Sequence, residues 1–375
     1  MNFIPYGKQS IEKDDINAIV EVLSSDYLTT GPKVKEFEKN IADYCGAKYC
    51  VAVSNGTAAL HLISLVLLQK GDKVLTTPNS FLATSNSILY AGARPVFIDI
   101  AKDGNIDLEL CEEALKKDDS IKVIYAVSFS GNMLNQEKLK YLKEKYNITI
   151  LEDNAHAIGA VYNNIKAGSC TNSDASIFSF HPVKHLTTGE GGAITTNSKE
   201  IYEKLLILRN HGMVRTAEMK PWEYKMRELG FNYRITDIQC ALGISQLKKL
   251  DSFIERRVQI AKSYDKAFKN SIVKPLYTYS GKSSYHLYVV QVDFTKLEID
   301  KEELFIKMRE KNIGLQLHYI PINKQPYYKN LGYGDEDTPV MDKYYKECFS
   351  LPIYPKLSDS EQEYVIDSLF EVLNG

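Results

Sequence analysis

The chain has 375 residues, a formal net charge of −2, 44% hydrophobic residues and 25% charged residues. This composition is typical of a globular protein and excludes a disordered or fibrous chain, and the length is sufficient for two domains. The small net charge gives no reason to expect a nucleic-acid or membrane partner. No segment approaches the roughly 18 uninterrupted apolar residues that a membrane span needs.

The six cysteines are scattered along the chain, and none forms the Cys-x-x-Cys pair that zinc and redox sites use. A chain of this size without a disulfide framework suits a reducing cytosol. Residues 1–8 lack the apolar stretch of a signal peptide. We therefore expect a cytoplasmic protein without a metal site.

Short apolar runs alternate with helical patterns from residue 49 to about residue 196. Strands are predicted over 49–54, 73–77, 95–100, 123–128, 148–153, 175–180 and 193–196. Helices are predicted between them over 58–68, 83–91, 108–116 and 136–145. Alternation of this kind predicts an α/β domain whose mostly parallel sheet is covered by helices on both faces.

The pattern changes in the last third of the chain. Two helices over 235–250 and 252–267 lead into it. Strands are then predicted over 286–292 and 314–318, and helices over 301–311 and 358–373. We expect a large α/β domain over residues 1–250 and a smaller C-terminal α+β domain over residues 251–375.

Two charged residues follow neighbouring strands of the predicted sheet. Asp153 ends the strand over 148–153, and Lys184 comes shortly after the strand over 175–180. Pyridoxal phosphate needs such a pair, because a lysine forms a Schiff base with its aldehyde and a carboxylate keeps its pyridine nitrogen protonated. Taken alone, a solvated lysine beside a strand-end aspartate is the simpler interpretation.

The segment Ser54-Asn55-Gly56-Thr57 lies between a predicted strand and a predicted helix. Gly56 allows close approach of a ligand to the backbone, and the first helical turn presents free N–H groups to an anion. The alternative is an ordinary strand–helix turn capped by Thr57. No Gly-x-x-x-x-Gly-Lys-Ser/Thr or Gly-x-Gly-x-x-Gly motif competes for a phosphate.

Seven short motifs occur in a fixed order along the chain. They are Leu28-Thr29-Thr30-Gly31-Pro32, Ser54-Asn55-Gly56-Thr57-Ala58-Ala59-Leu60, Glu152-Asp153-Asn154-Ala155-His156, Ser179-Phe180-His181-Pro182-Val183-Lys184, Gly189-Glu190-Gly191-Gly192, Gly230-Phe231-Asn232-Tyr233-Arg234 and His318-Tyr319 with Pro321. Together they resemble the DegT/DnrJ/EryC1/StrS family of sugar aminotransferases, which belongs to fold type I of the pyridoxal-phosphate enzymes. The resemblance covers nearly the whole chain.

The resemblance implies a role for each candidate residue. Lys184 and Asp153 would be catalytic. The cofactor would be bound by Gly56, Thr57, Phe81, Asp153, His156, Ser179, Lys184 and, from the other subunit of a homodimer, Asn232. The sugar pocket would be bordered by Thr30, Gly31, His318 and Tyr319.

Several of these residues also have structural interpretations. Phe81 could be a core residue at a helix start, and His156 could support its loop without lying near the cofactor ring. His318 could be a hydrogen-bonded histidine at a strand end. Arg234 could bind a substrate anion or pair with Asp237 three residues on.

The resemblance also implies a reaction. A family branch that performs dehydration carries histidine in place of Lys184, so the lysine favours transamination. The motifs are similar to the branch that aminates a UDP-linked 4-keto-6-deoxy-N-acetylhexosamine at carbon 4 for pseudaminic acid, and L-glutamate is the expected amino donor. Asn55-Gly56-Thr57 differs from the Asn-Ser-Ala that this branch often carries. A perosamine-type or bacillosamine-type aminotransferase, and a non-catalytic regulator or scaffold, are the alternatives.

Overall fold

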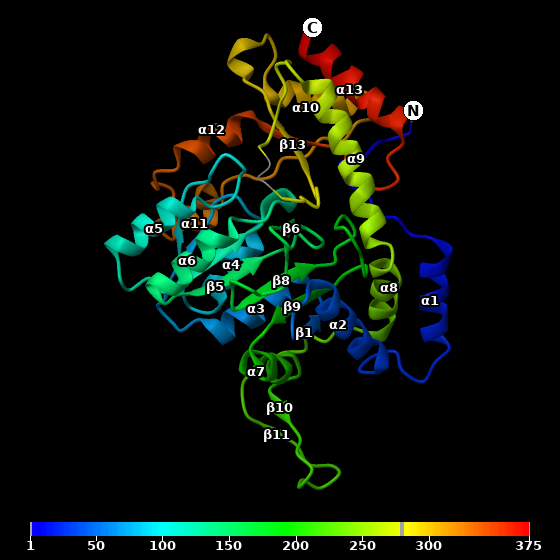
Figure 1. Ribbon diagram of the computed structural model, residues 1–375, viewed down its shortest axis with the longest axis vertical. Coiled ribbons are helices and arrows are strands. Elements are labelled where there is room, and N and C mark those ends of the chain that lie inside the picture. The colour runs from blue at the N-terminus through cyan, green and yellow to red at the C-terminus, as the bar shows by residue number, and fades with distance from the viewer. Residues whose placement is uncertain (1, 278–280, 375) are drawn as a thin grey trace.

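The computed structural model describes residues 2–277 and 281–374, and a seven-stranded sheet lies at its centre (Figure 1). The order of the strands is β1-β9-β8-β5-β4-β2-β3. Their bounds are Tyr49–Val53 for β1, Lys73–Thr76 for β2, Arg94–Phe97 for β3, Val123–Val127 for β4, Thr149–Asp153 for β5, Ala175–Ser179 for β8 and Gly192–Thr196 for β9. All seven predicted strands are therefore confirmed, each within a few residues of its predicted bounds.

The sheet is parallel except at β9. Pairings β2–β3, β2–β4, β4–β5 and β5–β8 are parallel, whereas β9 runs antiparallel to both β8 and β1. The register places Val127 opposite Asp153 and Asp153 opposite Ile177. The carboxyl ends of β4, β5 and β8 thus meet at one edge, where α/β proteins bind ligands.

Alternate strand residues enter separate cores on the two faces of the sheet. Val51 and Val53 pack with helices α3, α4 and α7, whereas Cys50 and Ala52 pack with α2 and α8. Helices α5 and α6 cover the remainder of the second face. The bounds are Pro32–Cys45 for α2, Gly56–Leu67 for α3, Leu82–Tyr90 for α4, Leu108–Lys117 for α5, Gln136–Tyr146 for α6, Lys199–Arg209 for α7 and Asp237–Leu247 for α8. Coverage on both faces confirms the predicted α/β fold of type I.

Short polar side chains start several of these helices. Asn55 caps α3, Asp107 caps α5, Asn135 caps α6 and Thr236 caps α8, each accepting a hydrogen bond from a backbone N–H of the first turn. Such caps satisfy donors that have no partner inside the helix. They fix the residue at which each strand–helix connection ends.

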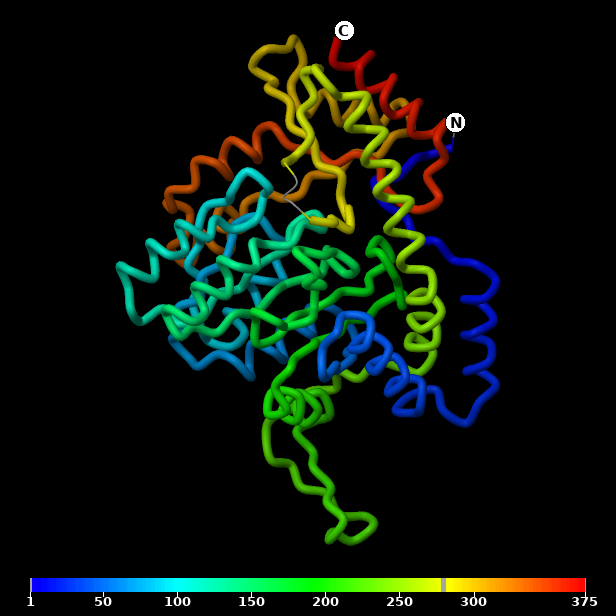
Figure 2. The backbone as a smooth tube through the Cα atoms, in the orientation of Figure 1, coloured from blue at the N-terminus to red at the C-terminus, as the bar shows by residue number. Residues whose placement is uncertain are grey.

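A second, smaller unit lies above the sheet in Figures 1 and 2 and holds the C-terminus. Its sheet has the antiparallel order β12-β13-β14. The bounds are Lys274–Pro275 for β12, Tyr288–Gln291 for β13, Cys348–Leu351 for β14, Lys301–Glu310 for α10, Pro326–Asn330 for α11, Pro339–Glu347 for α12 and Asp359–Asn374 for α13. Ile4, near the N-terminus, packs into the core of this unit.

Helix α9, Leu250–Phe268, connects the two units. Leu250 and Ile254 belong to a core of the large sheet, whereas Ile260, Tyr264 and Phe268 belong to the core of the small one. The expected boundary between residues 250 and 251 lies at the start of this helix, and its first turns pack on the large domain.

The predicted strand over 314–318 is wrong. Gln316 makes only an isolated bridge with Ser350 of β14. Gln316 and Ser350 exchange both backbone hydrogen bonds, so this register places Gly314 opposite Pro352, which has no N–H to donate. The Gly314 N–H instead bonds the carbonyl of Ile4 at 2.8 Å. His318 bonds the Ser350 hydroxyl at 2.8 Å. The ladder therefore does not extend beyond Gln316.

The remaining elements lie at the periphery. Helix α1 is Lys13–Leu23, and the short hairpins are Val161–Tyr162 with Ile165–Lys166 (β6 and β7) and Met213–Val214 with Lys225–Met226 (β10 and β11). The β10–β11 hairpin projects away from the body of the molecule (Figure 2). Within residues 2–277 and 281–374, no helix is both long and apolar enough to cross a membrane.

Candidate active site

A cavity of about 930 Å³ opens at the carboxyl ends of the parallel strands. It is lined from the large domain by Asn55, Gly56, Thr57, Phe81, Thr84, Asp153, His156, Ser179 and Lys184, and from the small domain by Gln316, Leu317, His318 and Tyr319. Its volume is in the range of small-molecule sites. Most of the predicted catalytic and cofactor-binding residues are therefore brought together.

Asp153 is buried at the end of β5. Its carboxylate accepts hydrogen bonds from the Thr84 hydroxyl at 2.6 Å and from the backbone N–H of Ala155 at 3.1 Å. Burial raises the pKa of Asp153, while these hydrogen bonds and the charge of Lys184 act in the opposite direction. A cationic group in the cavity would therefore stabilise the ionised carboxylate.

Lys184 lies in the turn after β8, where its backbone N–H bonds the carbonyl of His181 at 2.9 Å. Burial of the side chain lowers the pKa of Lys184 to about 8, and the charge of Asp153 opposes this shift. Desolvation disfavours the ammonium form, so a useful fraction of free amine exists near neutral pH. A free amine can act as a nucleophile and can accept a proton.

The start of α3 and the end of β8 form a polar cradle. Helix α3 begins at Gly56, and Asn55 caps it by accepting from the backbone N–H of Ala58 at 2.8 Å. A Cβ atom added to Gly56 would lie 3.0 Å from the Cβ of Ser179 and 3.2 Å from its hydroxyl oxygen. The missing side chain at Gly56 thus lets Ser179 approach the helix N-terminus, where backbone N–H groups favour an anion.

Aromatic and imidazole rings line the opposite part of the cavity. Phe81 is 60% exposed, which excludes the interpretation as a core phenylalanine. The Phe81 and Tyr319 ring centroids are 6.3 Å apart, and the Tyr319 hydroxyl lies 3.2 Å from Nε2 of His156. Burial and the charges of Lys184, His318 and His185 lower the pKa of His156, so its imidazole is neutral. His156 therefore lines the cavity, and it also contacts Tyr319 of the small domain.

Three predicted residues do not reach this cavity within one chain. Thr30 and Gly31 line a separate groove, and the Gly31 backbone N–H bonds Asp237 at 2.8 Å. Asn232 forms a bridge with Asn210 and is not among the residues lining the cavity. Among the described residues of one chain, Thr30, Gly31 and Asn232 are thus not brought together with Lys184 and Asp153.

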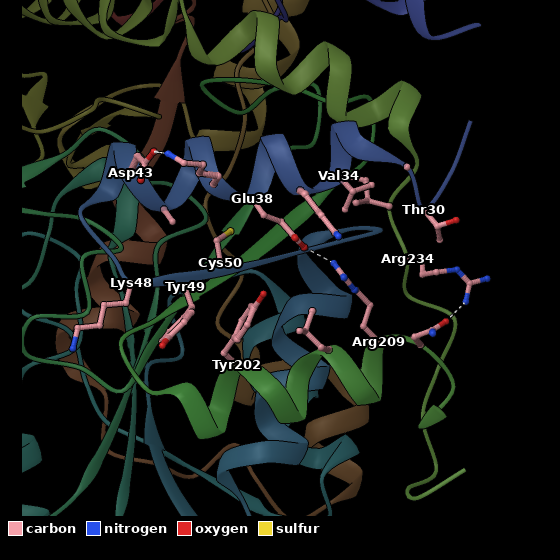
Figure 3. Close-up of a pocket in the computed structure, with 17 residues that line it drawn as sticks. Thr30, Val34, Glu38, Asp43, Lys48, Tyr49, Cys50, Tyr202, Arg209 and Arg234 are labelled. Carbon is pink, nitrogen blue, oxygen red and sulfur yellow. Dashed lines mark hydrogen bonds and ion pairs between the residues drawn. The ribbon is translucent and has the colours of Figure 1, made fainter. Parts of the chain in front are cut away.

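The groove that contains Thr30 and Gly31 lies between α2 and α7, over the edge strand β1 (Figure 3). An ion pair between Glu38 of α2 and Arg209 of α7 crosses it. Glu38 also accepts from the backbone N–H of Ala52, and Arg209 donates to the Ala52 carbonyl. These bonds give the exposed edge of β1 the partners that a neighbouring strand would supply.

Of the two alternatives for Arg234, the pairing with Asp237 is not what the structure has. The Arg234 guanidinium donates to Oδ1 of Asn210 at 2.7 Å, as Figure 3 shows at the end of the groove. Asp237 instead accepts from the backbone N–H groups of Gly31 and Lys33. These donors at the start of α2 stand more than 200 positions away in sequence.

The sequence interpretation missed Thr84 and His286. Thr84 bonds Asp153, and Nε2 of His286 lies 3.5 Å from the Lys184 amine. Thr84 follows Phe81 by one helical turn, which was a usable signal for the same cavity. His286 precedes a strand of the other domain, and nothing in its local sequence indicates a contact with Lys184.

The donor set fits pyridoxal phosphate. The cavity combines a lysine with free-amine character, a buried carboxylate, an anion cradle with a hydroxyl, and an exposed aromatic face. Each matches one part of that cofactor: its aldehyde, pyridine nitrogen, phosphate and ring. Gly56, Thr57 and Ser179 would hold the phosphate.

Comparisons with known proteins agree with this fit. The model of the DegT/DnrJ/EryC1/StrS aminotransferase family matches residues 9–370. The chain is 42% identical, over 99% of its length and 97% of the relative's, to the UDP-4-amino-4,6-dideoxy-N-acetyl-beta-L-altrosamine transaminase of Campylobacter jejuni strain 81-176. It is 37% identical to the Bacillus subtilis spore coat polysaccharide biosynthesis protein SpsC, covering 100% of this chain and 98% of that protein.

Two solved structures share the complete fold. Helicobacter pylori PseC, an aminotransferase of pseudaminic acid biosynthesis, matches with a TM-score of 0.93 and 32% identity over 100% of both chains. The PLP form of the sugar aminotransferase Spr1654 from Streptococcus pneumoniae matches with a TM-score of 0.90 and 32% identity over 99% of both chains. These matches overturn the alternative of a non-catalytic scaffold: the chain belongs to the DegT/DnrJ/EryC1/StrS aminotransferase family and is a pyridoxal-phosphate-dependent sugar aminotransferase.

Proposed function

We propose that the chain converts a UDP-linked 4-keto-6-deoxy-N-acetylhexosamine to the 4-amino sugar, with L-glutamate as the amino donor. The observation that carries this proposal is the full-length identity of 42% to the Campylobacter jejuni transaminase whose name specifies such a UDP-linked amino sugar. A 33% identical relative from Helicobacter pylori has the same name and covers 100% of this chain. Pseudaminic acid biosynthesis is the pathway in which PseC acts.

Within the cavity, Lys184 and Asp153 are the proposed catalytic residues. Pyridoxal phosphate, when bound, supplies an aldehyde that holds the amino group and a ring that withdraws electrons. Lys184 would supply the amine that holds the aldehyde and, when free, can carry a proton at its Nζ. The Asp153 carboxylate would stabilise a proton on the ring nitrogen through its charge.

The other lining residues orient and enclose the reactants. Phe81 offers a ring face for stacking, and His156 offers a neutral imidazole beside it. His318 and Tyr319 form the small-domain wall, where the sugar would lie.

We further propose a homodimer with shared sites. Asn232 would serve the phosphate, and Thr30 and Gly31 the sugar, of the neighbouring subunit. The support is that none of the three lines the cavity of its own chain. A twofold axis would make the two sites equivalent. A cytoplasmic location is also proposed, since all six cysteines are unpaired and buried, as a reducing compartment favours.

Substrate specificity is tested by product analysis. Purified enzyme with bound cofactor is incubated with L-glutamate and a panel of nucleotide 4-ketosugars, and products are identified by mass spectrometry and NMR. The UDP-linked 4-keto-6-deoxy-N-acetylhexosamine should react fastest and give a 4-amino sugar. Preference for a GDP-linked ketosugar would indicate a perosamine-type enzyme, and a product of bacillosamine stereochemistry would indicate the other alternative. Either result would reject the proposed substrate.

The shared site is tested by mixing two inactive variants, Asn232→Ala and Lys184→Ala. If the residues act on the same site from different subunits, the mixed dimer has one site with both defects and one intact site, and activity returns. If they act within one chain, both sites stay defective. Absence of recovery after subunit exchange has been verified by native mass spectrometry would reject the shared site.

A further inference from the structure

His286 is a buried residue from the small-domain side of the chain that reaches the Lys184 amine. Its Nε2 lies 3.5 Å from Lys184 Nζ, at the outer limit of a hydrogen bond. Its other ring nitrogen, Nδ1, has no hydrogen-bond partner among the described residues. A buried polar atom without a partner lowers the stability of the fold. Packing alone therefore does not explain a histidine at this position.

The segment that carries His286 is fixed on the large domain by hydrogen bonds. Ser284 donates from its backbone to the Gly131 carbonyl and from its hydroxyl to the carbonyl of His156. The carbonyl of Ser284 lies 2.9 Å from Nε2 of His185, the residue after Lys184. The backbone beside His286 is therefore anchored to the loop that holds Lys184.

Arg257 of α9 fixes the same segment from its other side. This arginine is 1% exposed, and its guanidinium donates to the main-chain carbonyls of Tyr285, His286 and Ile353 at 3.1, 3.2 and 2.9 Å. Within residues 2–277 and 281–374, no carboxylate pairs with it. A buried arginine without a carboxylate is costly, and a hydrophobic residue would be the stable choice.

The charges around the imidazole keep it neutral. His286 is faced by Lys184, His156, His185 and Arg257, and burial together with these groups lowers its pKa. A neutral imidazole can present a lone pair at Nε2, whereas an imidazolium cannot. The nearby cations of Lys184 and Arg257 therefore favour the form that accepts a hydrogen bond.

We propose that His286, held by Arg257, is a positioning residue for the Lys184 amine: Nε2 of His286 accepts one N–H of Lys184 and leaves the nitrogen lone pair directed into the cavity. This inference rests on the proposed role of Lys184. A hydrogen bond accepted from the amine restrains its torsion without occupying the lone pair. A bond donated to the amine would occupy that lone pair and block attack.

The first test uses the protein without cofactor. The pKa of Lys184 is measured by competitive acetylation across pH, with the Lys184 peptide followed by mass spectrometry. His286→Phe removes the acceptor and preserves a ring of similar size, so the ammonium loses a partner and the pKa should fall by about half a unit or more. His286→Gln retains an acceptor oxygen and should restore most of the difference.

The second test uses the enzyme with cofactor. His286→Phe should lower kcat about tenfold or more, although a lower lysine pKa alone would supply more free amine at pH 7. The loss should be the same for the amino donor and for the ketosugar, because Lys184 serves both half-reactions. A purely structural role in the sugar pocket would affect the ketosugar reaction alone.

Arg257 is tested with a matched control from the same helix. Arg257→Met should reproduce the pKa and kcat changes of His286→Phe. Arg256→Met, which removes a surface contact with Asp359, should leave both unchanged. If Arg257→Met does not fold, the His286 variants alone decide the question.

Distinct outcomes separate this inference from the role of Lys184 itself. Normal turnover by Lys184→Ala would reject the catalytic lysine and this inference with it. Loss of activity in Lys184→Ala with an unchanged pKa or an unchanged kcat in His286→Phe would reject the positioning role alone.

Discussion

The cavity around Lys184 and the groove around Arg209 both bury charge, but they treat it in opposite ways. In the groove, Glu38 and Arg209 pair with each other and with both backbone groups of Ala52. In the cavity, the Lys184 amine makes a long contact with His286 and no other hydrogen bond to a described residue. Ring nitrogens of His156 and His286 have no partner among the described residues. The ion pair in the groove bonds the backbone at the edge of β1, whereas the cavity contains polar groups that can bind a ligand.

The difference is instructive because composition alone would not separate the two sites. Each is lined by at least one lysine, two acidic residues and tyrosines. The two sites differ in how many of their polar atoms have hydrogen-bond partners. A buried pair whose polar atoms are all bonded stabilises the fold. A polar group without a partner, at the carboxyl ends of the strands, is available to a reactant. Four experiments test this distinction.

Lys184→Ala should have the largest effect on activity. We expect kcat to fall on the order of 10⁴-fold, about 5.5 kcal/mol, because the covalent holder of the cofactor and its proton carrier are both removed. The melting temperature should hold or rise, since a desolvated amine is lost. Steady-state kinetics measures the loss of turnover, and thermal unfolding measures the melting temperature. Near-normal turnover would contradict the assignment of Lys184 as the catalytic lysine.

Arg209→Met should have the largest effect on stability. It leaves the Glu38 carboxylate buried without its cation and the Ala52 carbonyl without a donor, a loss of about 3 to 5 kcal/mol in the free energy of unfolding. Lys39→Met, which breaks an exposed pair with Asp43 on the same helix, is the matched control and should cost less than about 1 kcal/mol. Urea unfolding measures both, and equal losses would refute the saturated-pair interpretation.

Asp153→Asn should preserve the fold and lower kcat roughly 100-fold, about 2.7 kcal/mol, because a neutral amide cannot hold the charge on the ring nitrogen. Thr84 can still bond the amide oxygen, so the local geometry should persist. Turnover of cofactor-loaded variant and its circular dichroism spectrum are the measurements. A loss smaller than about tenfold would assign this task to another residue.

The smallest effect concerns pH. The pKa of Lys184 is about 8 in the folded, cofactor-free protein, below the value of about 10.4 in an unfolded chain. Between these values the unfolded chain binds more protons, so stability rises with pH, by about 1 to 2 kcal/mol after allowing for partial solvent access. Below pH 8 the destabilisation is fully present. Comparing cofactor-free wild type with Lys184→Met by urea unfolding at pH 7 and pH 10 isolates this contribution; equal pH dependence would contradict it.

Much of the fold was predictable because the central strands are buried on both faces. Their runs of apolar residues, such as those from Val123 and Ile150, leave strand as the natural interpretation. The segment over 314–318 has a similar local pattern, yet its register places Gly314 opposite Pro352, and the Gly314 N–H bonds Ile4 near the N-terminus instead. Such distant partners cannot be predicted from hydrophobic periodicity.

The candidate site was predictable where its residues follow strands of one sheet. Asp153, Ser179 and Lys184 share that position, and topology brings them together. His286 and Arg257 lie on elements of the second unit, and their approach to Lys184 depends on how two domains pack. The same limit applies to Asn232, Thr30 and Gly31, whose predicted roles depend on a second chain.

Helix α9 has a consequence for dissecting the molecule. Its 19 residues span about 28 Å and insert one end into each core. A gene fragment that stopped at residue 250 would remove Ile254 from the core of the large sheet, and a cut inside the helix would separate Ile254 from Tyr264 and Phe268. Chimaeras built with a related aminotransferase should therefore exchange the whole of Leu250–Phe268 together with one of its neighbours, and splitting the helix should yield insoluble halves.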